Sequence, residues 1–374
     1  MTLHATVEFA RKALIAIALG FVGIIILFFL FRLGAFIKDT FFPAAALPAN
    51  AKFGTLTALE FPKSTINKSL TYRINTVSGQ LPQLPDRLNV YKIKQSQPNL
   101  LNLDKAKEKA TRLDFTDDHS RVLPETALDD INYEWQEVTG IRRKIRFNTV
   151  TFDFTLTSNY LSSLTVLNAK DLSDEEHALN TALSFLASIN QSPPDVDKTK
   201  TTTELYAIKD GALVASSSLS KAHVIRVDLH QKDVSYELNT GIPLSSGGTK
   251  KIKTTLPILY PHPPYSTMNF WIASGQSAQQ VVMANYIYKE PDVSKDIEAT
   301  YPIKTPAVAM EELKNGKAYI ATYFGSQDEI AINKIYLAYF LGESAQQYLM
   351  PIIVFEGDDG FFAYVSAVRP EWIE

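Results

Sequence analysis

The chain of 374 residues contains no cysteine. Disulfides, thiolate metal ligands and a cysteine nucleophile are therefore excluded. The sequence also lacks a strong net charge, because 37 basic and 40 acidic residues give a formal charge of −3 at pH 7. A nucleic-acid-binding domain is normally basic, so the composition argues against a nucleic-acid partner. Hydrophobic residues make up 45% of the chain, which is typical of a folded protein.

Histidines do not gather into a convincing metal site. The nearest arrangement places His223, Asp228 and His230 on one predicted strand. Side chains alternate between the two faces of a strand, so Asp228 and His230 share a face while His223 points to the other. We interpret these residues as part of an ordinary strand and predict no metal ligands.

Motifs for catalysis or cofactor binding are incomplete. The segment 247–250 (GGTK) lacks the earlier glycine that a phosphate-binding loop requires. Ser277 and Ser344 lack the final glycine of a nucleophile elbow, and Asp358 and Asp359 precede Gly360 in a predicted hairpin turn. We therefore expect no catalytic residue, no cofactor and no enzymatic activity.

One long apolar run stands near the start of the chain. Residues 13–31 (ALIAIALGFVGIIILFFLF) carry no charged, amide or hydroxyl side chain. As a helix they would reach about 28 Å, which is close to the hydrocarbon thickness of a bilayer. We predict a cytoplasmic tail at 1–12, a transmembrane signal anchor at 13–37 and the lipid bilayer as the partner of residues 13–31.

The direction of this span is not decided by the flanking charges, which are nearly even, with Arg11 and Lys12 before it and Arg32 and Lys38 after it. The short tail and the large following region favour a cytoplasmic N-terminus and an extracytoplasmic domain from residue 44 to 374. A cleaved signal peptide is the alternative, because the segments 44–46 (AAA) and 49–51 (ANA) resemble cleavage sites.

The remaining sequence alternates between helical and strand periodicity, which predicts an α+β fold. After a linker at 38–66, we expect three tandem units at 67–170, 171–298 and 299–374, each an amphipathic helix on an antiparallel sheet. The helices are expected at 103–113, 174–191 and 307–313, with Ser173 able to cap the second one. Segment 275–283 (GQSAQQVVM) is echoed at 342–350 (GESAQQYLM), and we interpret both copies as hairpin turns that arose by duplication.

A stiff aromatic segment lies between the second and third units. Residues 260–265 (YPHPPY) could expose Tyr260, His262 and Tyr265 as a partner surface. The alternative is a crossing loop whose rings cap the edge of a sheet.

The C-terminal unit resembles a known family. Segments 301–303 (YPI), 307–313, 334–340 (KIYLAYF) and 349–355 (LMPIIVF) are similar to YycH/YycI-type extracytoplasmic accessory regulators of a cell-wall histidine kinase. The helix and strands at 178–238 resemble PepSY-type modules. These resemblances imply one N-terminal span, an outward head of tandem α+β units and a noncatalytic role in holding or inhibiting a partner. The match is a pattern of apolar strands, so it transfers no functional residue.

We therefore expect a single-pass protein of the cell membrane with a noncatalytic binding or regulatory head that acts on a membrane or envelope protein. One alternative is a structural component of the cell envelope or of a surface assembly. Another alternative, implied by the PepSY resemblance, is an accessory subunit or inhibitor of an envelope protease. The sequence does not indicate a small-molecule ligand.

Overall fold

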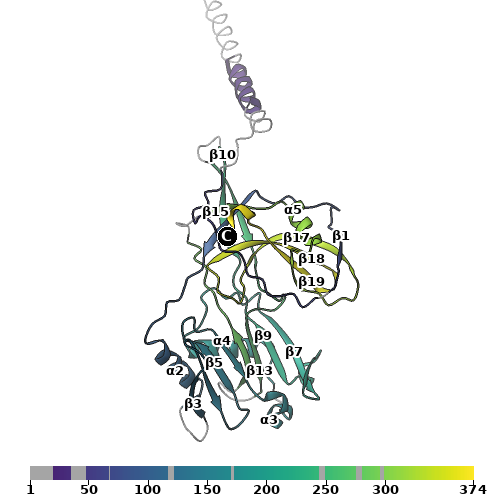
Figure 1. The fold of residues 1–374 in the computed structure, drawn as a ribbon. Helices are drawn as coiled ribbons and strands as arrows, with labels where there is room; N and C mark the ends of the chain where they lie inside the picture. Colours follow the sequence, from purple (N-terminus) through teal and green to yellow (C-terminus); the bar gives the residue numbers. More distant parts are fainter. Residues whose placement is uncertain are drawn as a thin grey trace, which may run out of the picture. The chain divides into compact units, whose positions relative to one another are not determined.

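The computed structural model describes residues 20–34, 48–66, 68–116, 122–169, 172–243, 249–274, 280–294 and 299–374. Two compact units are distinguished by their contacts. Residues 237–254 group with the N-terminal part of the chain up to Pro48, and the rest forms the body. The body is an α+β structure with two large sheets (Figure 1). The expected tail at 1–12 lies outside the described residues.

The first large sheet of the body has nine strands, and every neighbouring pair in it is antiparallel. Its order is β3-β4-β5-β6-β14-β13-β9-β7-β8. The strands are β3 (Val122–Ala127), β4 (Asn132–Glu137), β5 (Lys144–Asn148), β6 (Phe154–Thr157), β7 (Thr202–Lys209), β8 (Ala212–Ala215), β9 (Val224–Asp228), β13 (Met268–Ala273) and β14 (Val281–Tyr286).

Two helices cover one face of this sheet. Helix α2 (Asn102–Arg112) contributes Ala106 and Ala110, and α4 (Glu175–Ser188) contributes Ala182 and Phe185, to one core with the alternate side chains of the strands. Both helices were expected from their apolar stripes. The cap of α4 differs from the expectation, because the carboxylate of Asp174, one residue after Ser173, accepts the bond from the His177 backbone N–H at 2.8 Å.

The opposite face of the nine-stranded sheet is partly covered by short helical turns. These are η1 (Tyr160–Ser162) and α3 (Leu164–Leu167), with η2 (Leu219–Lys221) preceding β9. Tyr160 and Val166 pack there in a smaller cluster with Trp271 and Val224. Elsewhere this face carries polar side chains such as Arg146, Thr155 and Asn285.

The second large sheet has eight strands with a main path of β1-β17-β18-β19-β16. Strand β2 pairs with β15 and β18, and β12 pairs with β17 in parallel. The strands are β1 (Thr71–Ile74), β2 (Arg87–Lys92), β12 (Ile258–Leu259), β15 (Ala299–Pro302), β16 (Tyr319–Thr322), β17 (Glu329–Phe340), β18 (Tyr348–Gly357) and β19 (Phe361–Ser366).

Short helices complete the C-terminal region. Helix α5 (Pro306–Lys314) begins as expected, with Pro306 in its first turn and the Thr305 hydroxyl accepting from the Val308 N–H. The turns η4 (Asp358–Gly360) and η5 (Pro370–Trp372) follow β18 and β19. The predicted turn at Asp358 and Asp359 is confirmed, because η4 joins two antiparallel strands.

Strand pairing does not follow the expected boundaries at residues 170 and 298. Strands from both the first and the second expected units share the nine-stranded sheet, and β1, β2 and β12 cross into the C-terminal sheet. The body therefore has two sheets instead of one for each of three units. Periodicity locates a strand, but its partner depends on the whole fold, because any edge can pair with a distant strand. The strands on either side of the internal echo pair as β13–β14 and β17–β18, while residues 275–279 of the first predicted turn lie outside the described residues.

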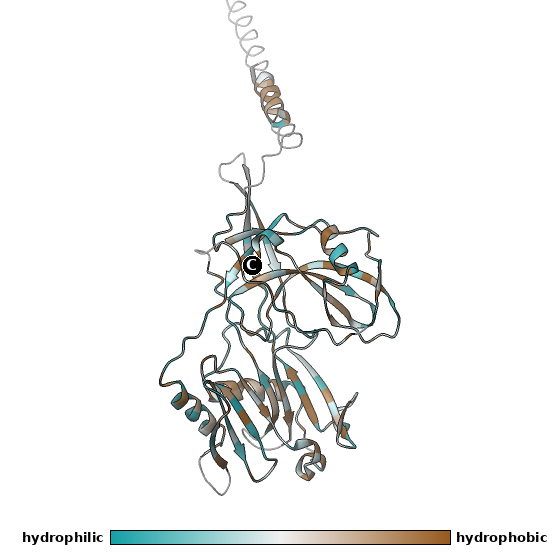
Figure 2. Ribbon diagram, in the orientation of Figure 1, coloured by the Kyte–Doolittle hydropathy of each residue, from teal (hydrophilic) through white to brown (hydrophobic). Residues whose placement is uncertain are grey.

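Residues 20–34 form an apolar helix with exposed side chains (Figure 2). Phe21, Leu27 and Phe31 are 66%, 67% and 76% exposed. Within the described part of the chain, no helix meets the length and apolarity needed to cross a bilayer. Residues 13–19 of the predicted span lie outside that part. A separate two-stranded sheet is formed by β10 (Val234–Pro243) and β11 (Thr249–Leu256).

Candidate functional site

The segment between β12 and β13 joins the two sheets of the body. The backbone carbonyls of Tyr260 and Pro261 accept bonds from the hydroxyls of Tyr364 at 3.2 Å and Tyr319 at 3.0 Å, both in the C-terminal sheet. On the other side, the Tyr260 hydroxyl accepts from the Gln231 backbone N–H at 3.2 Å. This crossing segment, residues 260–266, is therefore fixed at both sheets.

The three residues of the predicted partner surface have different environments. Tyr260 is only 2% exposed, so it cannot belong to an exposed surface. His262 is exposed, and Tyr265 is half-buried. Tyr260 can be buried because its hydroxyl accepts a hydrogen bond from the backbone N–H of Gln231. The sequence did not indicate this distant partner. For Tyr260 the structure agrees with the alternative of a crossing loop.

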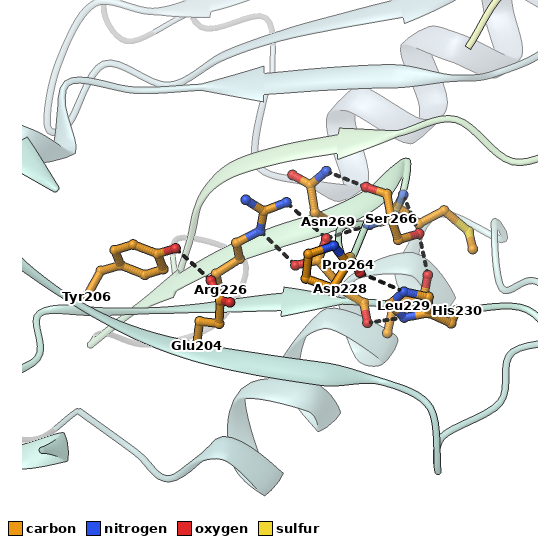
Figure 3. Close-up of polar contacts among 10 residues, drawn as sticks. Glu204, Tyr206, Arg226, Asp228, Leu229, His230, Pro264, Ser266 and Asn269 are labelled. Carbon is orange, nitrogen blue, oxygen red and sulfur yellow. Dashed lines mark hydrogen bonds and ion pairs between the residues drawn. The ribbon is translucent and has the colours of Figure 1, made fainter. Parts of the chain in front are cut away.

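A buried ion pair lies beneath Tyr265 at the end of β9. Arg226 donates from Nε to Oδ2 of Asp228 at 2.7 Å and from Nη2 to Oδ1 at 3.0 Å, and both side chains are largely buried (Figure 3). The Ser266 backbone N–H donates to the same Oδ1 at 2.8 Å. Burial raises the pKa of the Asp228 carboxyl, while the guanidinium of Arg226 opposes this effect. The pair thus ties β9 to the crossing segment.

Aromatic rings surround the guanidinium of Arg226. Its carbon Cζ lies 3.7 Å from the ring centroid of Tyr265 and 5.4 Å from that of Trp271. Glu204 on β7, Arg226 on β9 and Trp271 on β13 are in register across three neighbouring strands. Their alternate neighbours face the helices, so this row lies on the opposite face of the sheet.

A tyrosine two residues along β7, on the same face of the sheet, is bonded to the carboxylate of this row. The Tyr206 hydroxyl donates to Oε2 of Glu204 at 2.6 Å, and the ring of Tyr206 lies 5.0 Å from that of Trp271. Burial, together with the bond to Glu204, raises the pKa of Tyr206. A tyrosine hydroxyl is protonated at neutral pH, and the ionised Glu204 carboxylate can only accept, so Tyr206 is the donor in this bond.

His230 and Ser266 join the crossing segment to the residues at and after the end of β9. Nδ1 of His230 lies 3.2 Å from the carbonyl oxygen of Asp228, and Nε2 lies 3.1 Å from that of Pro264. The Ser266 hydroxyl donates to the Leu229 carbonyl at 2.5 Å and accepts from the Met268 N–H at 3.1 Å. A neutral imidazole has one N–H, so only the protonated ring can donate to both carbonyls.

The polar side chains around the crossing segment are suited to holding it in place, so that its exposed residues can contact a partner. The Ser266 hydroxyl donates to a backbone carbonyl, and the Asp228 carboxylate is paired with Arg226. Across the described residues, no group of three or more histidine and acidic side chains could hold a metal ion. His262 is exposed, and Tyr265 and Glu204 are partly exposed. We call these three residues the Tyr265 surface.

The sequence signals for this site were partial. The sequence pattern did not single out Arg226. One signal that could have identified Arg226 is its place inside the strand 224–228 (VIRVD), where a charged residue lies among apolar ones. A charge at such a position needs a partner, and Asp228 is two residues away on the same face.

A second concave region lies beside the helices of the nine-stranded sheet. A cleft of about 500 Å³ is lined by the C-terminal end of α2 at Arg112 and by His177 and Ser184 of α4. Arg112 is engaged, because Nη1 donates to the Ser188 carbonyl at 3.2 Å and Nη2 donates to Oε1 of Glu108 at 2.6 Å. These bonds fix the end of α4 against α2.

Comparison with known proteins yields little. No protein-family model matches the sequence, and no curated protein matches it. Among solved structures, the chain is similar to an uncharacterized protein from Eubacterium rectale at 10% identity, with a TM-score of 0.33. The alignment covers 82% of this chain and 90% of that protein. A likeness at this TM-score supports no argument about fold or function.

Proposed function

We propose that the protein is anchored in the cell membrane by its N-terminal helix and that its body is an extracytoplasmic, noncatalytic module that binds or regulates a membrane or envelope partner. The observation that carries the proposal is the apolar helix at residues 20–34. Large hydrophobic side chains such as Ile24, Leu27 and Phe31 are more than half exposed on it.

Such a helix is expected to leave water. Burying one large apolar side chain contributes about 1.5–3 kcal/mol, and this helix carries many of them. A helix that is apolar on all sides is typical of a protein core or of a membrane. Together with the apolar residues 13–19 that precede it in the sequence, it would match the thickness of a bilayer.

The arrangement of polar groups in the body is better suited to binding a partner than to catalysis. The buried side chains of Arg226, Asp228 and Ser266 are bonded to one another or to the backbone and hold the crossing segment. The Tyr265 surface reaches solvent on a support that is fixed at both sheets. A rigid support is suitable for a protein interface, because little freedom is lost on binding.

The absence of cysteine allows a direct test of anchoring and orientation. Single cysteines would be placed at Thr2→Cys and at Ser192→Cys, which is an exposed position of the body. In intact cells, a membrane-impermeant maleimide is expected to label position 192 and to label position 2 only after permeabilisation. Labelling of position 2 alone would contradict the orientation, and extraction of the protein by alkaline carbonate would contradict the anchor.

A further inference from the structure

The β10–β11 hairpin is set apart from both large sheets. Among the described strands, β10 and β11 pair only with each other. The Ser235 and Thr255 hydroxyls, 2.8 Å apart, mark the base of the pair. Residues 237–254 belong to a different compact unit from the body. An isolated two-stranded hairpin is only marginally stable in water, so a surface that covers this one would stabilise it.

The second strand of this hairpin is basic. Lys250, Lys251 and Lys253 lie on β11, and the only acidic residue of the sequence 234–256 is Glu237. Nζ of Lys251 lies 3.4 Å from Oε2 of Glu237, and both side chains are more than half exposed. An exposed pair of this kind is weak and leaves the lysines available to another anion.

An exposed apolar side chain stands among these lysines. Ile252, between Lys251 and Lys253, is 46% exposed. Side chains alternate along a strand, so Lys251 and Lys253 share one face of β11 while Ile252 lies on the other. Clusters of basic residues near a membrane are attracted to anionic lipid headgroups. The chemistry of this strand is therefore complementary to an anionic lipid surface.

The length of the chain allows the hairpin to reach that surface. The stretch from residue 35 to residue 48 can extend at most about 50 Å, at 3.3–3.6 Å per residue. A strand as long as β10 spans about 34 Å. The hairpin is thus comparable in length to the longest tether between the apolar helix and the body. A tether of this kind also raises the effective concentration of a weak contact.

We propose that the β10–β11 hairpin binds the anionic headgroups of the bilayer that holds the N-terminal helix, through the basic strand β11, on which Lys251 and Lys253 share one exposed face. This inference rests on the proposed membrane anchor. It gives the body a second contact with the membrane, which would restrict its orientation toward a partner.

The test uses the full chain in nanodiscs. An environment-sensitive fluorophore on Thr254→Cys would report on the hairpin, and spin-labelled lipids would serve as quenchers. We expect a blue shift and quenching in discs that contain phosphatidylglycerol. Both effects should be weaker in discs of phosphatidylcholine alone and should decrease at high salt.

A charge-removing variant and a matched control separate this contact from general electrostatics. Replacing Lys250, Lys251 and Lys253 by glutamine is expected to lower the ratio of bound to free hairpin on the order of 10²-fold. The control replaces Lys105, Lys198 and Lys221, which are exposed on the body, and should change it little. If the lysine variant fails to fold, the same contact is tested in the unsubstituted protein by measuring the fluorescence signal at increasing salt concentrations.

The outcomes distinguish the two proposals. If the chain does not co-purify with the discs, the membrane anchor is wrong. If it does and the fluorophore remains in water, or is quenched equally with and without phosphatidylglycerol, the hairpin inference is overturned and the anchor stands. A signal that depends on the number of chains per disc would indicate pairing of two hairpins and would also overturn it.

Discussion

The guanidinium carbon of Arg226 lies 3.7 Å from the ring centroid of Tyr265, so a residue of a central strand directly supports a residue of the crossing segment. The same guanidinium neutralises Asp228, whose carboxylate also receives the Ser266 N–H. One side chain therefore links the interior of the nine-stranded sheet to the Tyr265 surface. A stacked arginine contributes both charge and planar contact, which lysine cannot reproduce.

Removing this arginine should destabilise the body. Arg226→Met leaves the Asp228 carboxylate buried without its partner, and we expect a loss of about 3–5 kcal/mol in the free energy of unfolding. Urea denaturation measures it. The control is Arg146→Met, because Arg146 forms an ion pair with Glu134 but is half exposed, and its loss should cost at most about 1 kcal/mol. Equal losses for both variants would contradict the role given to Arg226.

The Tyr265 surface should contact the partner. A photo-crosslinking residue at His262, which is exposed, is expected to yield one dominant adduct with a membrane or envelope protein in cells. The same residue at Ser192 serves as the exposed control and should give a much weaker adduct. A ladder of adducts between copies of this chain would instead favour a structural assembly, and equal adducts at both positions would remove the surface as the binding site.

Tyr319 should make stability depend on alkaline pH. Burial raises its pKa to about 12, while an unfolded tyrosine ionises near pH 10. Below pH 10 the hydroxyl is neutral in both states. Between pH 10 and about 12 only the unfolded state loses the proton, so the free energy of unfolding falls. Tyr319→Phe should weaken this fall and cost about 0.5–1.5 kcal/mol at neutral pH through the lost bond to the Pro261 carbonyl. Urea midpoints across this pH range would show whether the two proteins differ in slope.

Asp153 should oppose folding once it is ionised. Burial raises the pKa of its carboxyl, although the Thr151 hydroxyl and the Tyr288 N–H donate to it. Its contribution to stability is fully present below the pKa of an unfolded aspartate and is lost as the pH rises through the higher folded value. Relative to the unsubstituted protein, Asp153→Asn should gain stability between pH 4 and 7. The idea fails if the stability difference between the two proteins stays constant over that range.

The start of α4 offers a test of a single cap. Asp174→Ala removes the acceptor of the His177 N–H and should cost about 1 kcal/mol, as N-cap replacements do. Ser173→Ala is the matched control and should have little effect. Thermal unfolding of both variants decides which residue caps the helix, and a larger loss at Ser173 would contradict the structure.

Local patterns predicted most elements of the C-terminal half. The apolar segments at 334–340 and 349–355 lie within β17 and β18, and the helix expected at 307–313 lies within α5. These features depend on residues that are near one another in the chain. The strand predicted to contain His223, Asp228 and His230 is shorter in the structure, because β9 covers Val224–Asp228 and both histidines lie beyond its ends.

Partners across the sheets could not be predicted in this way. Strand β1 pairs in parallel with β17, although the two are far apart in the sequence, and neither strand specifies the other by its own pattern. The candidate site depends on such pairing, because register brings Glu204, Arg226 and Trp271 into one row from three strands.

The sequence by itself determined the exclusion of cysteine chemistry, the apolar run and the α+β character, because composition and periodicity are properties of the chain alone. Only the tertiary structure decided that Tyr260 is buried, that Tyr265 rests on Arg226 and that the body has two sheets. Burial and long-range pairing are settled by the free energy of the whole fold, in which a distant backbone group such as the Gln231 N–H can become the partner of a tyrosine hydroxyl.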